Sequence, residues 1–243
     1  MTSDFTNVYD DQARAASYAT LDFPGTYLLA FRDLPAIIRE HVRGRAAVDF
    51  GCGAGRSTRF LRDLGFEVVG VDISAPMLAR ARERDPSGDY RLVGDGDFSA
   101  LPTGAYDVVL AAFTFDNVPT EERKVALFTA LERLLAPEGR IVAVVSSPEI
   151  YVHEWASFST RDFPENRRAR SGDVVRIVML DVPDRRPVED VMWSDEAYRE
   201  VFARAGLRAV ASDRPLGRAG EGPAWVSETT VAPWVIHVLG RPS

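Results

Sequence analysis

The sequence is poor in residues for thiol and metal chemistry, with one cysteine and three histidines in 243 residues. The single cysteine, Cys52, excludes an internal disulfide and a zinc site built from several cysteines. The histidines, His41, His153 and His237, do not have metal-ligand spacing. We therefore expect no metal centre.

Long hydrophobic runs are also missing. No apolar stretch approaches the roughly 20 residues that are needed to cross a bilayer. Residues 1–7 do not combine a basic region with a following hydrophobic stretch, as a secretion signal would. These absences favour a cytoplasmic protein without a membrane partner.

Excess positive charge is absent as well. The formal net charge is −7, and Lys124 is the only lysine. Proteins that neutralise nucleic-acid phosphates usually carry a basic face, so we expect no nucleic-acid partner. Arg167, Arg168 and Arg170 form the one local basic cluster, which favours a solvated loop over an anion clamp. The sequence does not indicate an oligomeric state.

The length and composition suit one α/β core with additions. Hydrophobic residues make up 46% of the chain and charged residues 27%, which is ordinary for a globular protein. A chain of 243 residues is long enough for one substantial core and a cap. We expect a single domain with an N-terminal arm over residues 1–45 and a cap insertion over about residues 148–192.

Short apolar runs alternate with helical patterns through the first part of the chain. The strand-like runs cover residues 46–50, 67–71, 90–93, 106–112 and 140–145. This alternation predicts a doubly wound, mostly parallel sheet with right-handed crossovers. The run 106–112 is unusually apolar, which indicates a central strand. A helix over residues 121–135 is expected to turn a stripe inward that consists of Val125, Phe128, Leu131 and Leu135.

The most informative segment is a glycine-rich turn after the first strand. Residues 48–57 read VDFGCGAGRS, and the second strand ends on Asp72. Glycines allow positive φ in a tight turn and let backbone groups lie against a ligand. An acid about 20 residues past the first glycine can accept hydrogen bonds from ribose hydroxyls. The segment therefore predicts a site for an adenosine-bearing cofactor, with Gly51, Gly53, Gly55 and Asp72 as contacts.

The spacing of the glycines in the loop discriminates between cofactors. The pattern is G-x-G-x-G, and Arg56 stands where the dinucleotide fingerprint needs its last glycine or alanine, which argues against an NAD-dependent oxidoreductase. The chain resembles the class I S-adenosylmethionine-dependent methyltransferases, whose first motif commonly reads as an apolar stretch, an acid and then G-x-G-x-G. Their second motif commonly reads as an acid followed by S-x-x-M-L, and residues 72–78 read DISAPML.

The resemblance implies roles for further residues around S-adenosylmethionine. Asp49 would organise the methionine end of the cofactor, and Phe113 would lie beside the methionyl chain. Asp95 and Gly96 would hold the adenine, with Asp97 as a rival for the acid. Apolar contacts to the ring would come from Ile73, Met77 and Phe98, each of which is equally suited to ordinary core packing.

The resemblance also implies a seven-stranded sheet in the order 3-2-1-4-5-7-6, closed by an antiparallel pair. Runs 207–212 and 233–239 are the candidates for that pair, after a helix that Ser194 caps. Two strands, 174–180 and 188–192, are expected inside the insertion. In the arm, Tyr9, Tyr18, Phe23 and Tyr27 either fold over the cofactor, as arms of the family do, or pack as ordinary aromatics.

Methyl transfer is an in-line displacement, which requires alignment and exclusion of water but not always a base. If there is a base, His153 is the first candidate, because imidazole titrates near neutral pH and its loop is expected to face the pocket. A lone histidine is more often structural. Asp116 and Glu154 are weaker candidates, and Trp155 is expected to line the substrate pocket.

We therefore expect a methyltransferase that acts on a small molecule. Two alternatives keep the fold: a methyltransferase of RNA or protein, and a non-catalytic protein that binds S-adenosylmethionine. The acidic charge disfavours nucleic acid. Nothing in the sequence excludes the non-catalytic alternative, because catalysis by alignment leaves little signature.

Overall fold

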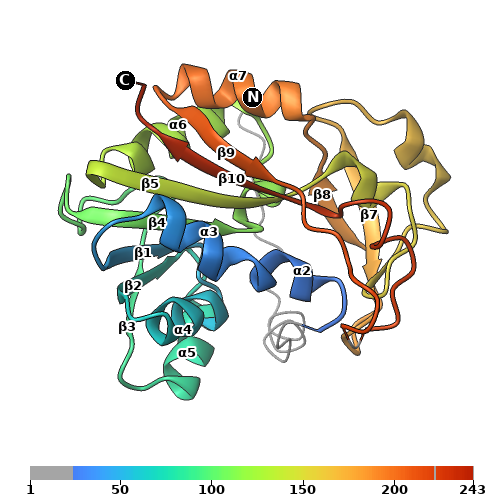
Figure 1. Cartoon of the computed structure of the whole chain (residues 1–243), viewed down its shortest axis with the longest axis horizontal. Helices are drawn as coiled ribbons and strands as arrows, with labels where there is room; N and C mark the ends of the chain where they lie inside the picture. The colour runs from blue at the N-terminus through green and yellow to red at the C-terminus, as the bar shows by residue number, and fades with distance from the viewer. Residues whose placement is uncertain (1–23, 222, 243) are drawn as a thin grey trace.

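The computed structural model describes residues 24–221 and 223–242, which are arranged around a seven-stranded sheet (Figure 1). The strand order is β3-β2-β1-β4-β5-β10-β9. The strands are β1 Ala46–Phe50, β2 Glu67–Asp72, β3 Asp89–Leu92, β4 Tyr106–Ala112, β5 Leu135–Ser146, β9 Arg208–Asp213 and β10 Trp234–Gly240.

This order confirms the predicted sheet, including its antiparallel end. The five strands β1 to β5 pair in parallel, whereas β10 runs antiparallel to both β5 and β9. The apolar strand β4 lies at the centre of the order, as its composition predicts. All parallel strands end at one edge, so the loops that follow β1, β2 and β4 meet there.

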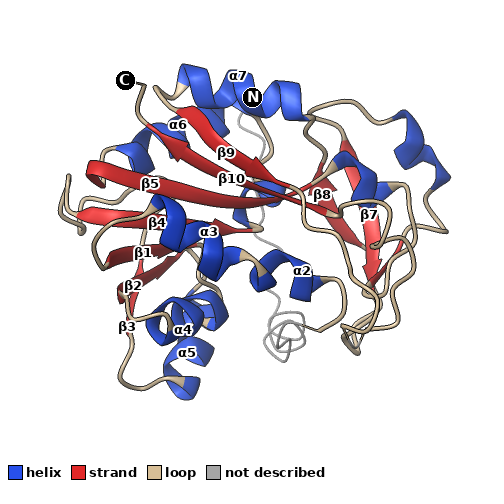
Figure 2. Ribbon diagram, viewed as in Figure 1, coloured by secondary structure: helices blue, strands red, loops and turns tan. Residues whose placement is uncertain are grey.

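Helices cover both faces of the sheet (Figure 2). Successive strand residues face opposite sides, so Ala47 packs in one hydrophobic cluster and Val48 in the other. The first cluster includes residues of α2, α3 and α4, and the second includes residues of α6 and α7. The helices are α2 Tyr27–Arg32, α3 Leu34–His41, α4 Arg56–Asp63, α5 Ala75–Arg84, α6 Glu121–Glu132 and α7 Asp195–Arg204.

The segment between α6 and β5 differs from the sequence prediction. The helix ends at Glu132, and β5 already begins at Leu135, ahead of Pro137. Gly139 makes this early pairing possible, because a Cβ there would meet the Tyr106 carbonyl oxygen at 2.6 Å. Of the predicted inward stripe, Phe128, Leu131 and Leu135 are buried, whereas Val125 is only half-buried and its neighbour Lys124 is fully buried.

The insertion forms a second sheet of three antiparallel strands in the order β6-β7-β8. Its strands are β6 Phe158–Ser159, β7 Val174–Met179 and β8 Val188–Val191, and its short 3-10 helices are η3 Pro148–Tyr151 and η4 Pro164–Arg168. The two strands expected in this region are thus confirmed as β7 and β8. The buried side chains of β7 belong to the same hydrophobic cluster as Tyr27 of α2 and Trp234 of β10, and Val188 of β8 packs against that cluster, so the small sheet extends the main core.

A buried carboxylate joins three distant parts of the chain. Glu228 is fully buried, and its Oε1 accepts hydrogen bonds from Thr26 Oγ1 (2.6 Å) and the Ala156 N–H (2.7 Å). Its Oε2 accepts from the Val226 N–H at 2.7 Å. The residue before α2, the insertion and the loop before β10 therefore meet at one side chain.

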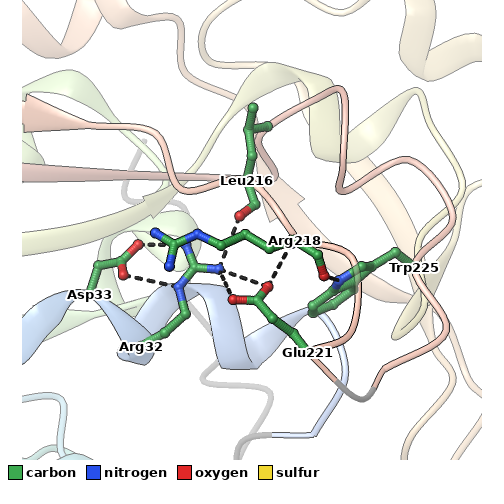
Figure 3. Close-up of polar contacts among 6 residues, drawn as sticks. All are labelled: Arg32, Asp33, Leu216, Arg218, Glu221 and Trp225. Atoms are coloured by element: carbon green, nitrogen blue, oxygen red, sulfur yellow. Dashed lines mark hydrogen bonds and ion pairs between the residues drawn. The ribbon is translucent and has the colours of Figure 1, made fainter.

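A second polar cluster fixes the same loop to the end of α2 (Figure 3). The Arg32 guanidinium donates to Asp33, to Glu221 and to the Leu216 carbonyl oxygen. Glu221 in turn accepts from the Arg218 N–H at 2.6 Å. These contacts hold α2, and with it Tyr27, against the carboxyl edge of the sheet.

In the part of the chain that the structure describes, no helix combines the length and the apolar character needed to cross a bilayer.

Candidate active site

The glycine loop leaves β1 with three residues in the left-handed region. Gly51, Gly53 and Gly55 have φ values of 71°, 53° and 78°. A Cβ on Gly51 would collide with the side chain of Thr114, and one on Gly55 would lie 2.5 Å from the Tyr90 hydroxyl. These two positions require glycine, because both the backbone angle and the space exclude a side chain.

Asp72 ties the glycine loop to the start of α5. Its Oδ2 accepts a hydrogen bond from the Gly53 N–H, and its Oδ1 accepts one from the Ser74 N–H, both at 2.8 Å. Ser74 then caps α5 by accepting from the Met77 N–H. The carboxylate therefore lies at the end of β2 with a fixed orientation, at the position expected for a ribose contact.

Asp49 lies beneath the loop, with no exposure to solvent. Its Oδ2 accepts hydrogen bonds from Ser57 Oγ (2.7 Å) and Thr58 Oγ1 (2.6 Å), which hold the first turn of α4. Among the described residues, its Oδ1 has no hydrogen-bond donor. Burial raises the pKa of this carboxyl to about 6, although both hydroxyls oppose the shift.

A cavity of about 1280 Å³, counting its open mouth, adjoins the glycine loop. Its walls come from the carboxyl edge of the main sheet and from the insertion. Of the predicted cofactor residues, the wall includes Gly51, Gly53, Asp72, Ile73, Met77, Asp95, Gly96 and Phe113. Asp49 and Gly55 are not among the residues that form this wall.

The structure distinguishes between the two acids proposed for the adenine. Asp95 lies on the cavity wall and forms an ion pair with Arg123, which also lines the cavity. Asp97 does not line it, and instead accepts a hydrogen bond from the Ser99 N–H (3.0 Å), which lowers the pKa of Asp97. Phe98 is buried against Phe50, in the core below the cavity.

Phe113 connects the main sheet to the N-terminal helix. Among the described residues it is the only non-glycine with positive φ, at 64°, a conformation that costs about 1–2 kcal/mol. Its ring packs against Tyr27 and Trp234, with centroids 5.6 and 4.7 Å away, and all three line the cavity. Of the arm aromatics, only Tyr27 can be placed, because Tyr9, Tyr18 and Phe23 lie outside the described residues.

The far end of the cavity carries two carboxylates. Asp116, which the sequence analysis named, follows β4 in the short 3-10 helix η2 (Thr114–Asn117) and accepts from the N–H and Oγ of Ser146. Asp190 comes from β8 and accepts a hydrogen bond from Tyr151 Oη at 3.2 Å. Burial raises the pKa of Asp116 to about 6, and burial together with Asp116 raises that of Asp190 to about 8.

Asp190 is not among the residues predicted from the sequence, although a signal was present. Alternation along β8 puts Asp190 on the same side as Val188, and both line the cavity. That alternation alone does not say which face the cavity is on. Only the packing of β8 against η2 places this acid beside Asp116.

The structure does not bring the other predicted catalytic and pocket residues to the cavity. His153 is 38% exposed and contacts Glu149 at 3.1 Å, so the expectation that it faces the pocket is wrong. Glu154 accepts from the Thr160 N–H within its own loop. The Trp155 ring is buried, its Nε1 donates to the Ile150 carbonyl oxygen, and Trp234 occupies the wall in its place.

Residues 48–143 match the family model described as a methyltransferase domain. The chain is 34% identical over 137 residues to a cypemycin N-terminal methyltransferase from Streptomyces sp, covering 55% of this chain and 54% of that protein. It is 32% identical over 137 residues to a ubiquinone biosynthesis O-methyltransferase from Thiobacillus denitrificans, covering 55% and 50%. The chain thus spans about half the length of the curated relatives it matches.

A solved S-adenosylmethionine-dependent methyltransferase from Mesorhizobium loti shares the fold, with a TM-score of 0.61 at 21% identity, over 86% of this chain and 97% of that one. The family match covers the glycine loop, Asp72 and the strands that carry them. By its motifs, its strand order and this match, the region of residues 48–143 is similar to the methyltransferase domain of the class I S-adenosylmethionine-dependent methyltransferases.

Proposed function

We propose that this protein transfers a methyl group from S-adenosylmethionine to a small-molecule acceptor. One observation carries the proposal: a single cavity contains both the predicted cofactor residues of the main sheet and an apolar chamber made by the insertion. The methyl donor and the methyl acceptor would therefore meet in one cavity.

The residues at the glycine loop fit S-adenosylmethionine. Asp72 would accept from the ribose hydroxyls, Asp95 and Gly96 would contact the adenine, and Ile73 and Met77 would pack against its ring. The buried Oδ1 of Asp49 could accept a hydrogen bond from a donor group at the methionine end of the cofactor. When bound, the cofactor supplies an electrophilic methyl group on a sulfonium centre.

The chamber next to these residues suits a small acceptor. Its wall is mostly apolar and includes Ile150, Phe158, Ile177, Met179, Val188 and Trp234. Such a pocket buries an organic molecule and excludes the water that would compete for alignment. The chain's acidic net charge also disfavours an RNA acceptor.

The side chains have simple tasks in this reaction. The apolar walls would orient the acceptor for in-line attack, which is the main source of rate in such a displacement. Asp116 and Asp190 are the carboxylates on the wall that can hold a proton or a positive charge near the acceptor.

Calorimetry with S-adenosylmethionine and S-adenosylhomocysteine tests the cofactor assignment. Asp72→Ala should weaken binding of both by about 1–3 kcal/mol, because charge-assisted hydrogen bonds to the ribose are lost. Asp97→Ala is the matched control, because this acid lies off the cavity wall and should leave the affinity unchanged. Tight binding of NAD with no response to either sulfur ligand would refute the proposal.

A second measurement addresses the acceptor. Release of S-adenosylhomocysteine should be followed over a panel of metabolites, with RNA and protein extracts as separate arms. Turnover confined to small molecules is the expected result. Turnover of RNA or protein alone, or cofactor binding without turnover in any arm, would support one of the alternatives.

A further inference from the structure

The acceptor end of the cavity places two acids together that belong to different parts of the fold. Asp116 lies in η2, at the carboxyl edge of the main sheet, and Asp190 lies in β8 of the insertion. The two elements pack against each other, and both side chains line the cavity. The site that the proposed function requires therefore has an acidic patch in an otherwise mostly apolar chamber.

The two carboxylates differ in how many hydrogen bonds they accept from the protein. Asp116 is 5% exposed and accepts from Ser146 through both the N–H and the hydroxyl, at 2.9–3.2 Å. Asp190 is half-buried, and among the described residues its one hydrogen bond comes from Tyr151 Oη, to Oδ2. A carboxylate can accept about four hydrogen bonds, so Asp190 retains acceptor capacity at the cavity wall.

The protein supplies little positive charge at this end. Among the described residues, Arg123 is the only cation on the cavity wall, and it pairs with Asp95 at the cofactor end. Lys124 lies behind the wall, where its Nζ donates to the Phe115 carbonyl oxygen and lies over the Trp193 ring, 5.0 Å from its centroid. Burial lowers the pKa of Lys124 to about 7, although Asp116 and Asp190 both oppose this shift, so at neutral pH Lys124 offsets only part of the charge of the two acids.

We propose that the methyl acceptor is an amine on an apolar skeleton, whose nitrogen is held by Asp190 with Asp116 beside it. This inference rests on the proposed function, since it names the acceptor for the same cavity. A cationic nitrogen would complete the acidic patch, and the apolar walls would receive the carbon skeleton. The positive charge of the bound amine would favour the ionised form of Asp190, against the burial and the Asp116 charge that raise the pKa of this carboxyl.

Asp190, the amine and the methyl donor account for every proton and electron pair in the transfer. The bound ammonium gives one proton to the Asp190 carboxylate and becomes a neutral nucleophile. The nitrogen lone pair then forms the new N–C bond as the methyl–sulfur bond breaks, and the electron pair of that bond stays on sulfur. The product is again an ammonium ion, and the sulfur leaves as a neutral thioether.

The test measures binding to the protein loaded with S-adenosylhomocysteine. The probes are matched sets that share one skeleton and differ in the polar group: benzylamine, benzyl alcohol and benzoate; octylamine, octanol and octanoate; and the naphthylmethyl equivalents. In at least one set the amine should bind at least tenfold more tightly than the alcohol and the acid, as expected for a charge-assisted hydrogen bond.

Variants assign the preference to Asp190. Asp190→Asn keeps the shape and removes the charge, so it should reduce amine affinity by about tenfold or more and leave alcohol binding unchanged. Glu189→Gln makes the same change on the next residue of β8, off the cavity wall, and should have no effect. The amine should also be methylated by wild type and more slowly by Asp190→Asn.

The binding measurements distinguish a failure of the amine inference from a failure of the proposed function. If S-adenosylhomocysteine itself does not bind, the proposed function fails. If it binds but alcohols or acids bind as well as amines, if no amine binds at millimolar concentration, or if Asp190→Asn leaves amine affinity intact, only the amine inference is overturned.

Discussion

Several ionisable residues of this chain are buried and hold protonation states that water would not favour. His237 is the simplest case, because it lies on β10, apart from the cavity acids. Its Nδ1 lies 2.8 Å from Ser212 Oγ, its ring packs on Phe202, and its Nε2 has no hydrogen-bond partner among the described residues. Burial lowers the pKa of His237 to about 4.

The depressed pKa of His237 predicts an acid-sensitive contribution to stability. In the folded protein the ring stays neutral down to about pH 4, whereas the unfolded chain takes up its proton near pH 6.5. The contribution is therefore complete above pH 6.5 and is lost as pH falls towards 4. Between about pH 7 and about pH 5, wild type should lose about 2 kcal/mol more free energy of unfolding than His237→Gln.

Urea denaturation at the two pH values measures this difference. The raised pKa values of Asp49, Asp116 and Asp190 act in the opposite direction, but they are common to both proteins and cancel in the comparison. Ser212→Ala keeps the imidazole and should retain the wild-type pH slope. Equal slopes for wild type and His237→Gln would show that the ring is not held neutral.

At the scale of elements, the molecule depends on contacts between segments that are far apart in the sequence. The helix α2 has only six residues and no side-chain cap, so its position comes from packing and from its neighbours. Thr26 donates to Glu228, accepts from the Ser157 N–H, and offers its carbonyl oxygen to Trp234 Nε1 at 2.9 Å. These bonds connect the N-terminal helix, the insertion and β10.

Glu228→Ala should therefore destabilise the protein by about 3 kcal/mol or more. The substitution leaves the buried Thr26 hydroxyl and the part-buried Ala156 and Val226 N–H groups without their carboxylate acceptor, and donors shielded from water are costly to leave unpaired. Chemical denaturation measures the loss. Glu138→Ala, at an exposed position near the start of β5, is the matched control and should change stability by less than about 0.5 kcal/mol.

One outcome would contradict this role of Glu228. If Glu228→Ala were as stable as Glu138→Ala, the three segments would be held by apolar packing alone. Glu228→Gln refines the experiment, because it retains one acceptor oxygen and should recover part of the lost stability.

At the scale of the whole molecule, two sheets divide the proposed reaction between them. The main sheet carries the glycine loop, Asp72 and Asp95, and the small sheet supplies Ile177, Met179, Val188 and Asp190 to the same cavity. Binding of the cofactor and binding of the acceptor should therefore be separable by substitution.

Val188→Trp tests whether acceptor binding can be impaired without loss of cofactor binding. The larger ring should fill the acceptor end, so turnover should fall by about tenfold or more because the acceptor loses its aligned position. The affinity for S-adenosylhomocysteine, measured by calorimetry, should stay within about threefold of wild type. Val174→Trp places the same ring on β7, where the side chain is 62% exposed, and should leave both quantities unchanged. Parallel loss of cofactor affinity and turnover in Val188→Trp would contradict the division.

The geometry of the glycine loop was predictable because its signals are local. Gly51, Gly53 and Gly55 stand where a turn needs positive φ, and Asp72 closes a strand that the apolar pattern identifies. The boundary between α6 and β5 was predicted less well, because residues after Glu132 read equally as helix end or strand start. Pairing with β4 across the sheet decides between them, and a local pattern does not contain that information.

The part of the cavity wall that the insertion supplies was predictable only in outline. The insertion and its two long strands follow from the sequence, but His153 and Asp190 illustrate what does not. Both are polar residues in a cap, and sequence alone gives no reason to prefer the acid over the imidazole. Packing of β8 onto η2 turns Asp190 into the cavity, whereas the 3-10 turn before His153 turns its ring towards Glu149.

By itself, the sequence determined the fold class, the strand order through its family resemblance, and the cofactor loop, because glycine spacing and apolar runs act over a few neighbouring residues. The tertiary structure alone decided which side chains share the cavity: Trp234 rather than Trp155, Asp95 rather than Asp97, and Asp190 beside Asp116. The physical reason is that a cavity wall is assembled from contacts between residues distant in sequence, and which face of an element is buried depends on what packs against it.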